Sequence, residues 1–588
     1  MKELKRLNSY FIKYKRYLLL GVLFLTISNL FAVYPAHIIG QATKFIIQNI
    51  TSQLAKNGAD ISYEAISFEV IKFGLIIIAM AFTKGIFQFL TRQTIINMSR
   101  HIEYDQKNEI YDHYQKLPLS FYRSNNTGDL MNRISEDVSK VRMYIGPALM
   151  YGLNFLVTFI AVIFFMLMVN PELTLYTLLP LPILSLSVYY VSNKMNVQSD
   201  AIQSSQSGLS TFVQEAFSGI RVLKAFVRED ESIKNFTEKS EIYKQKSLKL
   251  SLTQALFFPL IILLIGASTV LTVYIGTKLA MKGEIHVGNI TEFVIYVNML
   301  TWPVTSLGWI TSIVQRASAS QSRINEFLDV KPSIVSDKNV QNKILGNVQF
   351  SNVSLEYKDS NIKALKNVSF EIKAGQTLAF VGNTGSGKST IAHLMTRLYD
   401  VTEGEIKIDG FSIKDLDLAD FRSQIGFVPQ DNFLFSDSIK NNILFGTKGI
   451  THDKVIEAAK LADVYENIMR FDKQFETLVG ERGITLSGGQ KQRITIARAL
   501  IRDPQLLILD DCLSAVDTKT ENKILQNLDQ VMKGKTSIVI SHRASTVKFA
   551  DNIIVLDHGE IVEQGSHEEL LAMNGHYKEL YEMQLEEN

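Results

Sequence analysis

The chain contains a single cysteine among its 588 residues, and its charges nearly cancel. Cys512 alone cannot form a disulfide within the chain or build a cysteine-ligated metal site. A formal net charge of +2 provides no global attraction to nucleic acid, so no nucleic-acid partner is expected. A cleavable signal peptide is not expected either, because the first apolar run is long and lacks a small-residue cleavage site. A chain of this length is expected to form more than one domain.

Long apolar runs dominate the first half of the chain. Buried helices of a soluble protein would carry more charges over so many long segments. Basic residues before the first run favour a cytoplasmic N-terminus. Loops 39–68, 170–172 and 278–287 then face outward, and the polar segments 92–144 and 194–252 are expected to continue as helices into the cytoplasm. Runs near the ~20 residues that span a bilayer predict six transmembrane helices, over 17–38, 69–91, 145–169, 173–193, 253–277 and 288–312.

Few polar side chains interrupt these runs. Lys84 lies inside the second run, and a cation within the membrane is a candidate functional residue. Its position towards the cytoplasmic end favours instead a lysine that reaches the membrane surface. Gln88, Asn154 and Asn298 could line a substrate cavity or form hydrogen bonds between helices, and the sequence leaves both interpretations open.

The second half has the composition of a soluble α/β domain and contains a phosphate-binding motif. Strand 377–381 runs into "GNTGSGKS", which has the form G-x-x-x-x-G-K-S, and a helix follows. Backbone N–H groups of such a loop cradle phosphate oxygens. Lys388 is expected to reach the β- and γ-phosphates, and Ser389 to coordinate Mg²⁺. The predicted ATP-binding residues of this loop are Gly382, Asn383, Thr384, Gly385, Ser386, Gly387, Lys388, Ser389 and Thr390.

A second strand, "LLILD" at 506–510, ends in Asp510 and is followed directly by Asp511. Two adjacent carboxylates at the end of a buried strand are costly unless chemistry or a metal uses them. Asp510 is expected to hold the Mg²⁺ shell through a carboxylate oxygen. Asp511 occupies a position from which a base could polarise an attacking water.

The stretch "LSGGQ" at 486–490, followed by "KQRITIARAL" and the acidic strand, resembles the signature of ABC transporter ATPases. With six preceding spans, the chain resembles an exporter-type ABC half-transporter of the MsbA-like, multidrug type. The resemblance implies a multidomain fold, with an all-α six-helix transmembrane domain (type I ABC exporter fold) followed by an α/β P-loop ABC ATPase domain. The implied boundaries are 1–330 for the membrane domain, 331–345 for a linker and 346–588 for the ATPase domain.

The same resemblance assigns further site residues. Tyr357 would stack on adenine, Gln430 would contact Mg²⁺ or water, and His542 would lie near the γ-phosphate. The implied catalytic residues are Asp511, His542, Gln430 and Lys388, and the implied metal ligands are Ser389, Gln430 and Asp510. Ser487, Gly488, Gly489 and Gln490 would contact the nucleotide on the other subunit's P-loop. A second ABC half-transporter is therefore an expected partner, with ATP and Mg²⁺ as cofactors.

Other stretches resemble parts that connect the two domains. Segments 117–137 and 217–229 are similar to the coupling-helix regions of ABC exporters, and Glu481 lies in the loop that would touch such helices. "SAVD" at 514–517 resembles the loop that crosses the dimer. These similarities imply ATP-driven export of a substrate by alternating access, in the plasma or inner membrane, with the ATPase domain in the cytoplasm.

Asp511 departs from the family pattern, in which efficient members have Glu after the metal-binding Asp. The Asp side chain is one methylene shorter than that of Glu, so its carboxylate lies further from the position of a base that activates water. Loss of a positioned base typically lowers the rate of hydrolysis by ~10²–10⁴. The sequence therefore resembles the weakened subunit of a heterodimeric exporter, with a homodimer as the alternative. A fused metal-chelate-type importer and a non-transporting ABC ATPase are the other function classes. A small molecule, a lipid or a peptide could be the substrate, because the sequence does not identify it.

Overall fold

The structure is a computed structural model that describes residues 2–57, 63–336, 338–514 and 516–586. Contacts divide the chain into two compact units, Met1–His113 with Gly128–Asp329, and Tyr114–Thr127 with Val330–Asn588. The boundaries expected from the sequence, at 330 and 345, stay a proposal. The two divisions differ most at the segment Tyr114–Thr127. The sequence places this segment in the membrane domain, whereas its contacts group it with the second unit.

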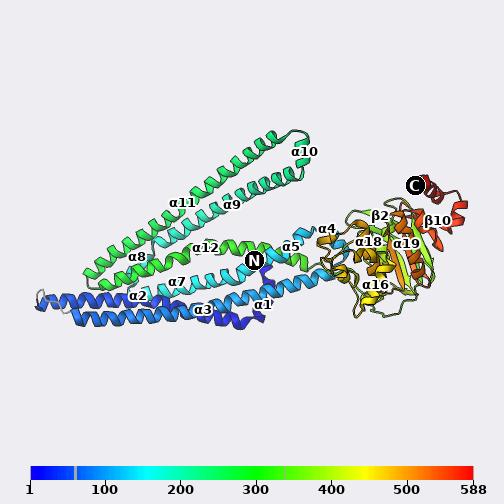
Figure 1. The fold of residues 1–588 in the computed structure, drawn as a ribbon. Helices are drawn as coiled ribbons and strands as arrows, with labels where there is room; N and C mark the ends of the chain where they lie inside the picture. The colour runs from blue at the N-terminus through cyan, green and yellow to red at the C-terminus, as the bar shows by residue number, and fades with distance from the viewer. Residues whose placement is uncertain (1, 58–62, 337, 515, 587–588) are drawn as a thin grey trace. The chain divides into compact units, whose positions relative to one another are not determined.

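The first unit consists of long helices (Figure 1). Within the described residues, six segments are long and apolar enough to cross a membrane, which confirms the six predicted spans. Each helical segment runs well beyond the ~20 residues that a bilayer requires, as expected for the polar extensions. The helices of this unit are η1 (Glu3–Leu7), α1 (Asn8–Lys13), α2 (Lys15–Asn57), α3 (Tyr63–Lys116), α5 (Thr127–Asn132), η2 (Arg133–Asp137), α6 (Val138–Met143), η3 (Tyr144–Ala148), α7 (Leu149–Val169), α8 (Pro171–Leu178), α9 (Pro180–Ser218), α10 (Ile220–Ala225), α11 (Glu229–Met281) and α12 (Val287–Leu328).

Helices α2, α7 and α12 form a packed centre in the first unit. Val33 of α2, Val162 of α7 and Phe293 of α12 belong to one buried apolar cluster. The crossing of α2 and α12 is close at Gly40 and Gly288, where a Cβ on Gly288 would collide with the carbonyl oxygen of Gly40. Small residues let helix backbones approach in this way.

Helices α9 and α11 form a long antiparallel hairpin, and the short helix α10 closes its far end (Figure 1). At the other end, Thr177 of α8 lies 3.0 Å from Thr272 of α11, hydroxyl to hydroxyl, and the Ser268 hydroxyl donates to the Thr177 carbonyl at 2.7 Å. Large apolar side chains are exposed at the far end around α10. They are Phe217, Ile220, Val222, Phe226 and Val227.

The second unit contains two sheets, in which strand order is β2-β1-β4-β5 and β10-β9-β3-β8-β7-β6. In the larger sheet β10 is antiparallel to β9 and the other pairs are parallel. Its parallel strands are almost continuously apolar because buried clusters cover both faces. The strands are β1 (Val348–Tyr357), β2 (Ile362–Ile372), β3 (Thr377–Val381), β4 (Glu403–Ile408), β5 (Phe411–Ser412), β6 (Ile425–Val428), β7 (Leu506–Asp510), β8 (Thr536–Ile540), β9 (Asn552–Asp557) and β10 (Glu560–Gly565).

Helices surround these sheets, and α4 comes from the segment that lies between helices of the first unit. The helices of the second unit are α4 (Leu119–Ser124), α13 (Lys388–Met395), α14 (Leu418–Ser423), α15 (Ile439–Ile443), α16 (His452–Leu461), α17 (Tyr465–Met469), η4 (Gln474–Glu476), η5 (Glu481–Gly483), α18 (Gly488–Leu500), α19 (Thr518–Met532), α20 (Ala544–Val547), α21 (His567–Ala572) and α22 (His576–Glu586).

The register of the larger sheet brings the functional segments to one edge. Phe380 of β3 and Asp510 of β7 both lie beside Ile540 of β8. Because these strands are parallel, the loops that follow them leave the sheet at its carboxyl edge, where ligands bind in open α/β sheets. The predicted strands 377–381 and 506–510 coincide with β3 and β7.

Candidate active site

The loop between β3 and α13 has a backbone that only glycine fits at two positions. Gly382 and Gly387 have φ angles of 143° and 103°, in a region that side chains disfavour. A Cβ on Gly387 would lie 2.5 Å from the carbonyl oxygen of Ala364, and a Cβ on Gly382 would collide with that of Leu556. The loop therefore presents its backbone N–H groups at the N-terminus of α13, an arrangement that suits phosphate.

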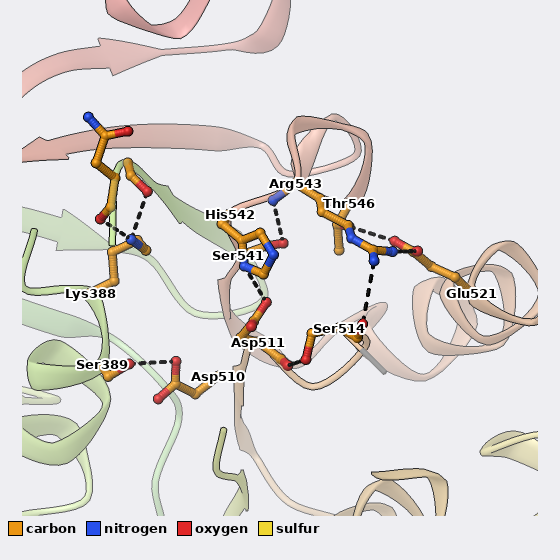
Figure 2. Close-up of polar contacts among 12 residues, drawn as sticks. Lys388, Ser389, Asp510, Asp511, Ser514, Glu521, Ser541, His542, Arg543 and Thr546 are labelled. Carbon is orange, nitrogen blue, oxygen red and sulfur yellow. Dashed lines mark hydrogen bonds and ion pairs between the residues drawn. The ribbon is translucent and has the colours of Figure 1, made fainter. Parts of the chain in front are cut away.

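Lys388 is folded over this loop (Figure 2). Its Nζ donates to the carbonyl oxygens of Gly382 and Asn383, each at 2.7 Å, and to Ser386 Oγ at 3.3 Å. Burial lowers the pKa of Lys388, while the nearby carboxylates of Asp511 and Asp510 act in the opposite direction. An incoming phosphate would give this ammonium a charged acceptor, which forms a stronger hydrogen bond than a carbonyl does.

Ser389 and Asp510 are joined by a hydrogen bond, in which Ser389 Oγ donates to Asp510 Oδ1 at 3.0 Å (Figure 2). Burial raises the pKa of Asp510 to about 6, so a nearby cation would stabilise its charged form. Adjacent oxygen ligands of an octahedral Mg²⁺ at ~2.1 Å lie roughly 3 Å apart, so these two oxygens fit neighbouring positions. Among the described residues, no group of three His, Cys, Asp or Glu side chains forms a separate metal site.

Asp511 points towards His542 (Figure 2). Asp511 Oδ1 lies 2.9 Å from His542 Nδ1, and the aspartate side chain is 11% exposed whereas the histidine is 50% exposed. The backbone N–H of Asp511 donates to the carbonyl oxygen of Ile540 at 2.8 Å, which fixes this residue against β8. The acid at the predicted base position is therefore engaged by a histidine of its own chain.

Arg543 connects the loop after β8 with the segment after β7. Its guanidinium forms an ion pair with Glu521 of α19 and donates to the Ser514 carbonyl oxygen at 3.4 Å (Figure 2). Glu521 is buried and also accepts from Thr546 Oγ1 at 2.8 Å. The Ser514 hydroxyl donates to the Asp511 carbonyl oxygen at 3.1 Å. The segments that contain Asp511 and His542 are thus linked by a continuous polar network.

A pocket of about 490 Å³ brings most of the predicted site residues together. Its walls include Tyr357, Thr384, Gly385, Gly387, Lys388, Ser389, Thr390, Gln430, Asp510, Asp511 and His542. Gly382, Asn383 and Ser386 belong to the same loop without lining the pocket.

The "LSGGQ" residues Ser487, Gly488, Gly489 and Gln490 do not line this pocket. They form the beginning of α18 instead. Ser487 Oγ accepts from the Gln490 N–H at 3.3 Å, and Gln490 Oε1 accepts from the Ser487 N–H at 3.0 Å. This reciprocal pair is a capping box, which satisfies N–H groups that a helix start would leave without partners.

Arg123 also lines the pocket, and the sequence did not predict this. It belongs to α4, and its guanidinium carbon lies 4.9 Å from the centre of the Tyr357 ring. It also donates to Tyr399 Oη at 3.5 Å and lies 3.8 Å from Asp359. The sequence similarity pointed to 117–137 as a coupling region, but nothing in the local pattern singled out Arg123 as a pocket residue.

Two family models match the chain. The model described as "ABC transporter transmembrane region" matches residues 18–304, and the model described as "ABC transporter" matches residues 365–514. The second match includes the P-loop and the acidic strand, and the first extends over the predicted membrane spans from residue 18 to residue 304.

Similar proteins extend over most of the chain. It is 38% identical, over 81% of its length and 82% of the relative's, to the probable multidrug resistance ABC transporter ATP-binding/permease protein YheI of Bacillus subtilis (strain 168). It is 32% identical, over 99% and 97%, to the multidrug resistance-like ATP-binding protein MdlA of Escherichia coli (strain K12). A solved bacterial Atm1-family ABC exporter with ATP bound aligns with a TM-score of 0.80 at 26% identity, over 97% of this chain and 99% of that one.

Proposed function

The chain belongs to the ABC transporter family as an exporter-type half-transporter, and we propose that it is the slowly hydrolysing half of a heterodimer. It is a multi-pass membrane protein whose ATPase domain couples ATP hydrolysis to export. ABC exporters work as dimers in a lipid membrane, and this chain provides six candidate spans and one such ATPase domain.

The Asp511–His542 contact is the observation that carries the proposal. A base that positions water must lie within ~2.6–3.2 Å of the proton it accepts. Asp511 has a short side chain, and its carboxylate is only 11% exposed and directed at His542. We therefore expect this site to bind ATP and hydrolyse it slowly. An intact "LSGGQ" would complete the competent site of a partner that has Glu at the corresponding position.

The other site residues support ATP binding. Lys388 and the loop 382–387 would bind the phosphates, Thr390 would help to hold them, and Tyr357 would stack on adenine. Ser389, Asp510 and Gln430 would hold Mg²⁺, which neutralises charge on the phosphate oxygens. His542 would contact the γ-phosphate side of the pocket. Ser487, Gly488, Gly489 and Gln490 would contact the nucleotide held by the other subunit.

The exposed end of the α9–α11 hairpin supports assembly with a second chain. Phe226 and Val227 beside α10 are 73% and 82% exposed, and apolar groups gathered at one exposed end mark an interaction surface. ATP that binds the associated state of two ATPase domains more tightly would shift the membrane helices between two arrangements. Its hydrolysis and release would reset them.

We place the chain in the plasma or inner membrane with the N-terminus and the ATPase domain in the cytoplasm. The six basic residues before the first predicted span at residue 17 support this orientation, because basic flanks are retained on the cytoplasmic side. The ATPase domain must also reach the cytoplasmic ATP pool. The names of the relatives support a hydrophobic or amphipathic substrate. The names of these two relatives do not support the alternative importer and non-transporting classes.

The proposal is tested by purification with and without a partner. The chain is expressed alone and together with a half-transporter that has Glu at the position of Asp511, and phosphate release is measured after purification. We expect the chain alone to bind ATP with little hydrolysis and the complex to hydrolyse it. Replacing the partner's Glu by Gln should abolish most of this activity, whereas Asp511→Asn should have a small effect.

A homodimer with two slow sites is the second candidate, and the presence of His542 in the pocket favours it. The two candidates separate in the same experiment. A chain that forms a stable dimer by itself, with its own ATP hydrolysis coupled to transport, would rule out the heterodimer proposal.

A further inference from the structure

Glu292 of α12 is a buried carboxylate among the apolar membrane helices, with a side chain that is 1% exposed. It lies near the start of the sixth predicted span, 288–312. Its Oε1 lies 2.9 Å from His37 Nδ1 of α2 and accepts from Tyr296 Oη at 3.0 Å. Its Oε2 accepts from Asn289 Nδ2 at 3.2 Å. A buried carboxylate within the membrane is costly without such partners, so Glu292 marks a candidate functional site.

The other polar side chains singled out in the spans are not buried in this way. Lys84, Gln88 and Asn154 line a cavity of about 300 Å³ between α2, α3, α7 and α12. The sequence favoured a Lys84 that reaches the membrane surface, and the structure places it in the wall of this cavity. Asn154 also accepts from Asn29 Nδ2 at 3.0 Å, whereas Asn298 donates to a carbonyl of its own helix. These groups therefore meet solvent or ordinary partners.

The contact between His37 and Glu292 joins α2 to α12 where the two backbones cross closely. A Cβ on Gly40 would lie 3.0 Å from Glu292 Oε2, and a Cβ on Gly288 would collide with the carbonyl oxygen of Gly40. The side chain of His37 is 29% exposed, in contrast to the enclosed carboxylate. Water can therefore exchange protons with the imidazole while the crossing stays closed.

Few other titratable groups surround the pair. The centre of the Tyr34 ring lies 5.8 Å from that of His37. Helices α7, α8 and α11 contribute apolar side chains to the buried cluster that contains Tyr296. Lys44 is the next charged residue along α2, and among the described residues no hydrogen bond or ion pair joins Lys44 or His286 to Glu292. His37 is thus the group whose charge can compensate the carboxylate.

Gln41 allows His37 to adopt two protonation states. Gln41 Nε2 lies 2.8 Å from His37 Nε2, while the other ring nitrogen faces Glu292. In this orientation the amide N–H donates to an unprotonated Nε2, and the neutral ring donates to Glu292 through Nδ1–H. When Nε2 takes up a proton from water, a half-turn of the amide presents Oε1 as the acceptor for Nε2–H. Both ring nitrogens have a partner in either state.

The two states differ in net charge. With a neutral His37 the enclosed site carries one negative charge, whereas uptake of a proton turns it into an ion pair without net charge. An imidazolium attracts the carboxylate more strongly than a neutral imidazole does. If the crossing opened, water would solvate Glu292 instead. The closed crossing therefore binds the proton more tightly than an open one, so a fall in pH favours the closed crossing.

We propose that His37 and Glu292 form a proton-binding site that ties α2 to α12 at the outward end of the membrane helices. Histidine ordinarily changes its charge between about pH 5 and 8, so the tie is strong in acid and weakens as the pH rises. Export moves the helices between two arrangements, and a stronger tie would oppose separation of α2 from α12. This inference rests on the proposed export function and orientation, which place this end outside the cytoplasm.

A double-mutant cycle at two pH values tests the tie. The two tryptophans of the chain, Trp302 and Trp309, both belong to α12, so tryptophan fluorescence during heating reports this helix. The full-length wild type, His37→Gln, Glu292→Gln and the double variant are heated in an uncharged detergent without nucleotide, at about pH 5.5 and about pH 8. We expect the coupling between the two substitutions, measured in midpoint temperature, to be at least about 2 °C larger at the lower pH.

Further variants separate the tie from a hydrogen bond with only a structural role. His37→Lys carries a charge at both pH values, so its coupling to Glu292 should be the same at both. His286→Gln is the matched control, because His286 is exposed and directly precedes α12. Its coupling to Glu292 should not change with pH. If Glu292→Gln fails to unfold cooperatively, the wild type is compared with His37→Gln, and the higher midpoint of the wild type should shrink as the pH rises.

Equal coupling of His37 and Glu292 at the two pH values would overturn the proposal, and so would the same pH-dependent change in His286→Gln. The measurement needs neither ATP nor a second half-transporter. If coupled ATPase activity proved absent while the pH-dependent coupling persisted, the export proposal would fail and the proton-binding site would stand.

Discussion

The guanidinium of Arg123 lies over the ring of Tyr357, 4.9 Å from its centre, although α4 is separated from β1 by most of the first unit's sequence. Tyr357 is the residue proposed to stack on adenine. A separation of 4.9 Å leaves no room for a base between the two groups, so a base would stack on the other face of the ring or beside the guanidinium. Arg123 is therefore positioned to contribute to nucleotide binding from the segment that joins two helices of the first unit.

Arg123→Ala should weaken ATP binding by about 3- to 10-fold, because cation–π contacts contribute ~0.5–2 kcal/mol. Equilibrium titration with a fluorescent ATP analogue measures this change. Arg123→Lys keeps the charge but not the planar group, so its affinity for ATP should lie between those of the wild-type chain and Arg123→Ala. Unchanged or tighter binding in Arg123→Ala would show that Arg123 competes with the base instead of contacting it.

Asp511→Glu should accelerate ATP hydrolysis. The added methylene carries the carboxylate further into the pocket, and a positioned base is worth ~10²–10⁴ in rate. We expect a rise of at least about tenfold in phosphate release per site, measured in the same assembly for both proteins. Asp453→Glu, at an exposed position of α16, is the control and should leave the rate unchanged. No acceleration in Asp511→Glu would place the cause of slow hydrolysis elsewhere in the pocket.

His393 of α13 should make stability depend on pH. Burial lowers the pKa of His393 from its ordinary value of 6.5, and the charge of Arg123 lowers it further. Below pH 6.5, His393 therefore binds a proton in the unfolded chain but stays neutral in the folded chain until the pH reaches its lower, folded-state pKa. Stability from this residue is fully present above that pH and is lost as pH falls towards the lower, folded-state pKa.

The thermal unfolding midpoint of the full chain, followed across this range, checks the effect of His393. His393→Gln removes the titrating group and should flatten the loss on the acid side. His576→Gln is the control, because the His576 side chain is 60% exposed. If the two variants show the same acid-side slope, another group is responsible for it.

Gly288→Ala should destabilise the first unit. The new Cβ would collide with the carbonyl oxygen of Gly40, which cannot move without the backbone of α2. Overpacking of this kind typically costs ~1–3 kcal/mol. Gly152→Ala on α7 is the matched control, since a Cβ there meets no atom within 4 Å among the described residues. The thermal midpoints of the two detergent-solubilised variants should differ, and equal midpoints would contradict the close crossing.

Features with a local signal could be predicted from the sequence. The limits of β3 follow from a motif that requires a strand, a loop and a helix in immediate succession, and those of β7 follow from an apolar run that ends in Asp510. The six spans follow from length and hydropathy. Arg123 and Lys84 could not be placed in this way. Periodicity shows which face of a helix is apolar, but it does not show which distant element covers the polar face. The contact of Arg123 with Tyr357 and the cavity around Lys84 both depend on that long-range packing.

The apolar end of the α9–α11 hairpin has a consequence for how the protein is produced. A copy without its second half leaves Phe217, Val222, Phe226 and Val227 facing water, and such surfaces attract chaperones, proteases and other unpaired copies. We expect surplus copies to be degraded or to aggregate, so that the abundance of one half limits that of the other. In the proposed heterodimer, the same side chains that serve assembly would then set the ratio at which the two halves accumulate.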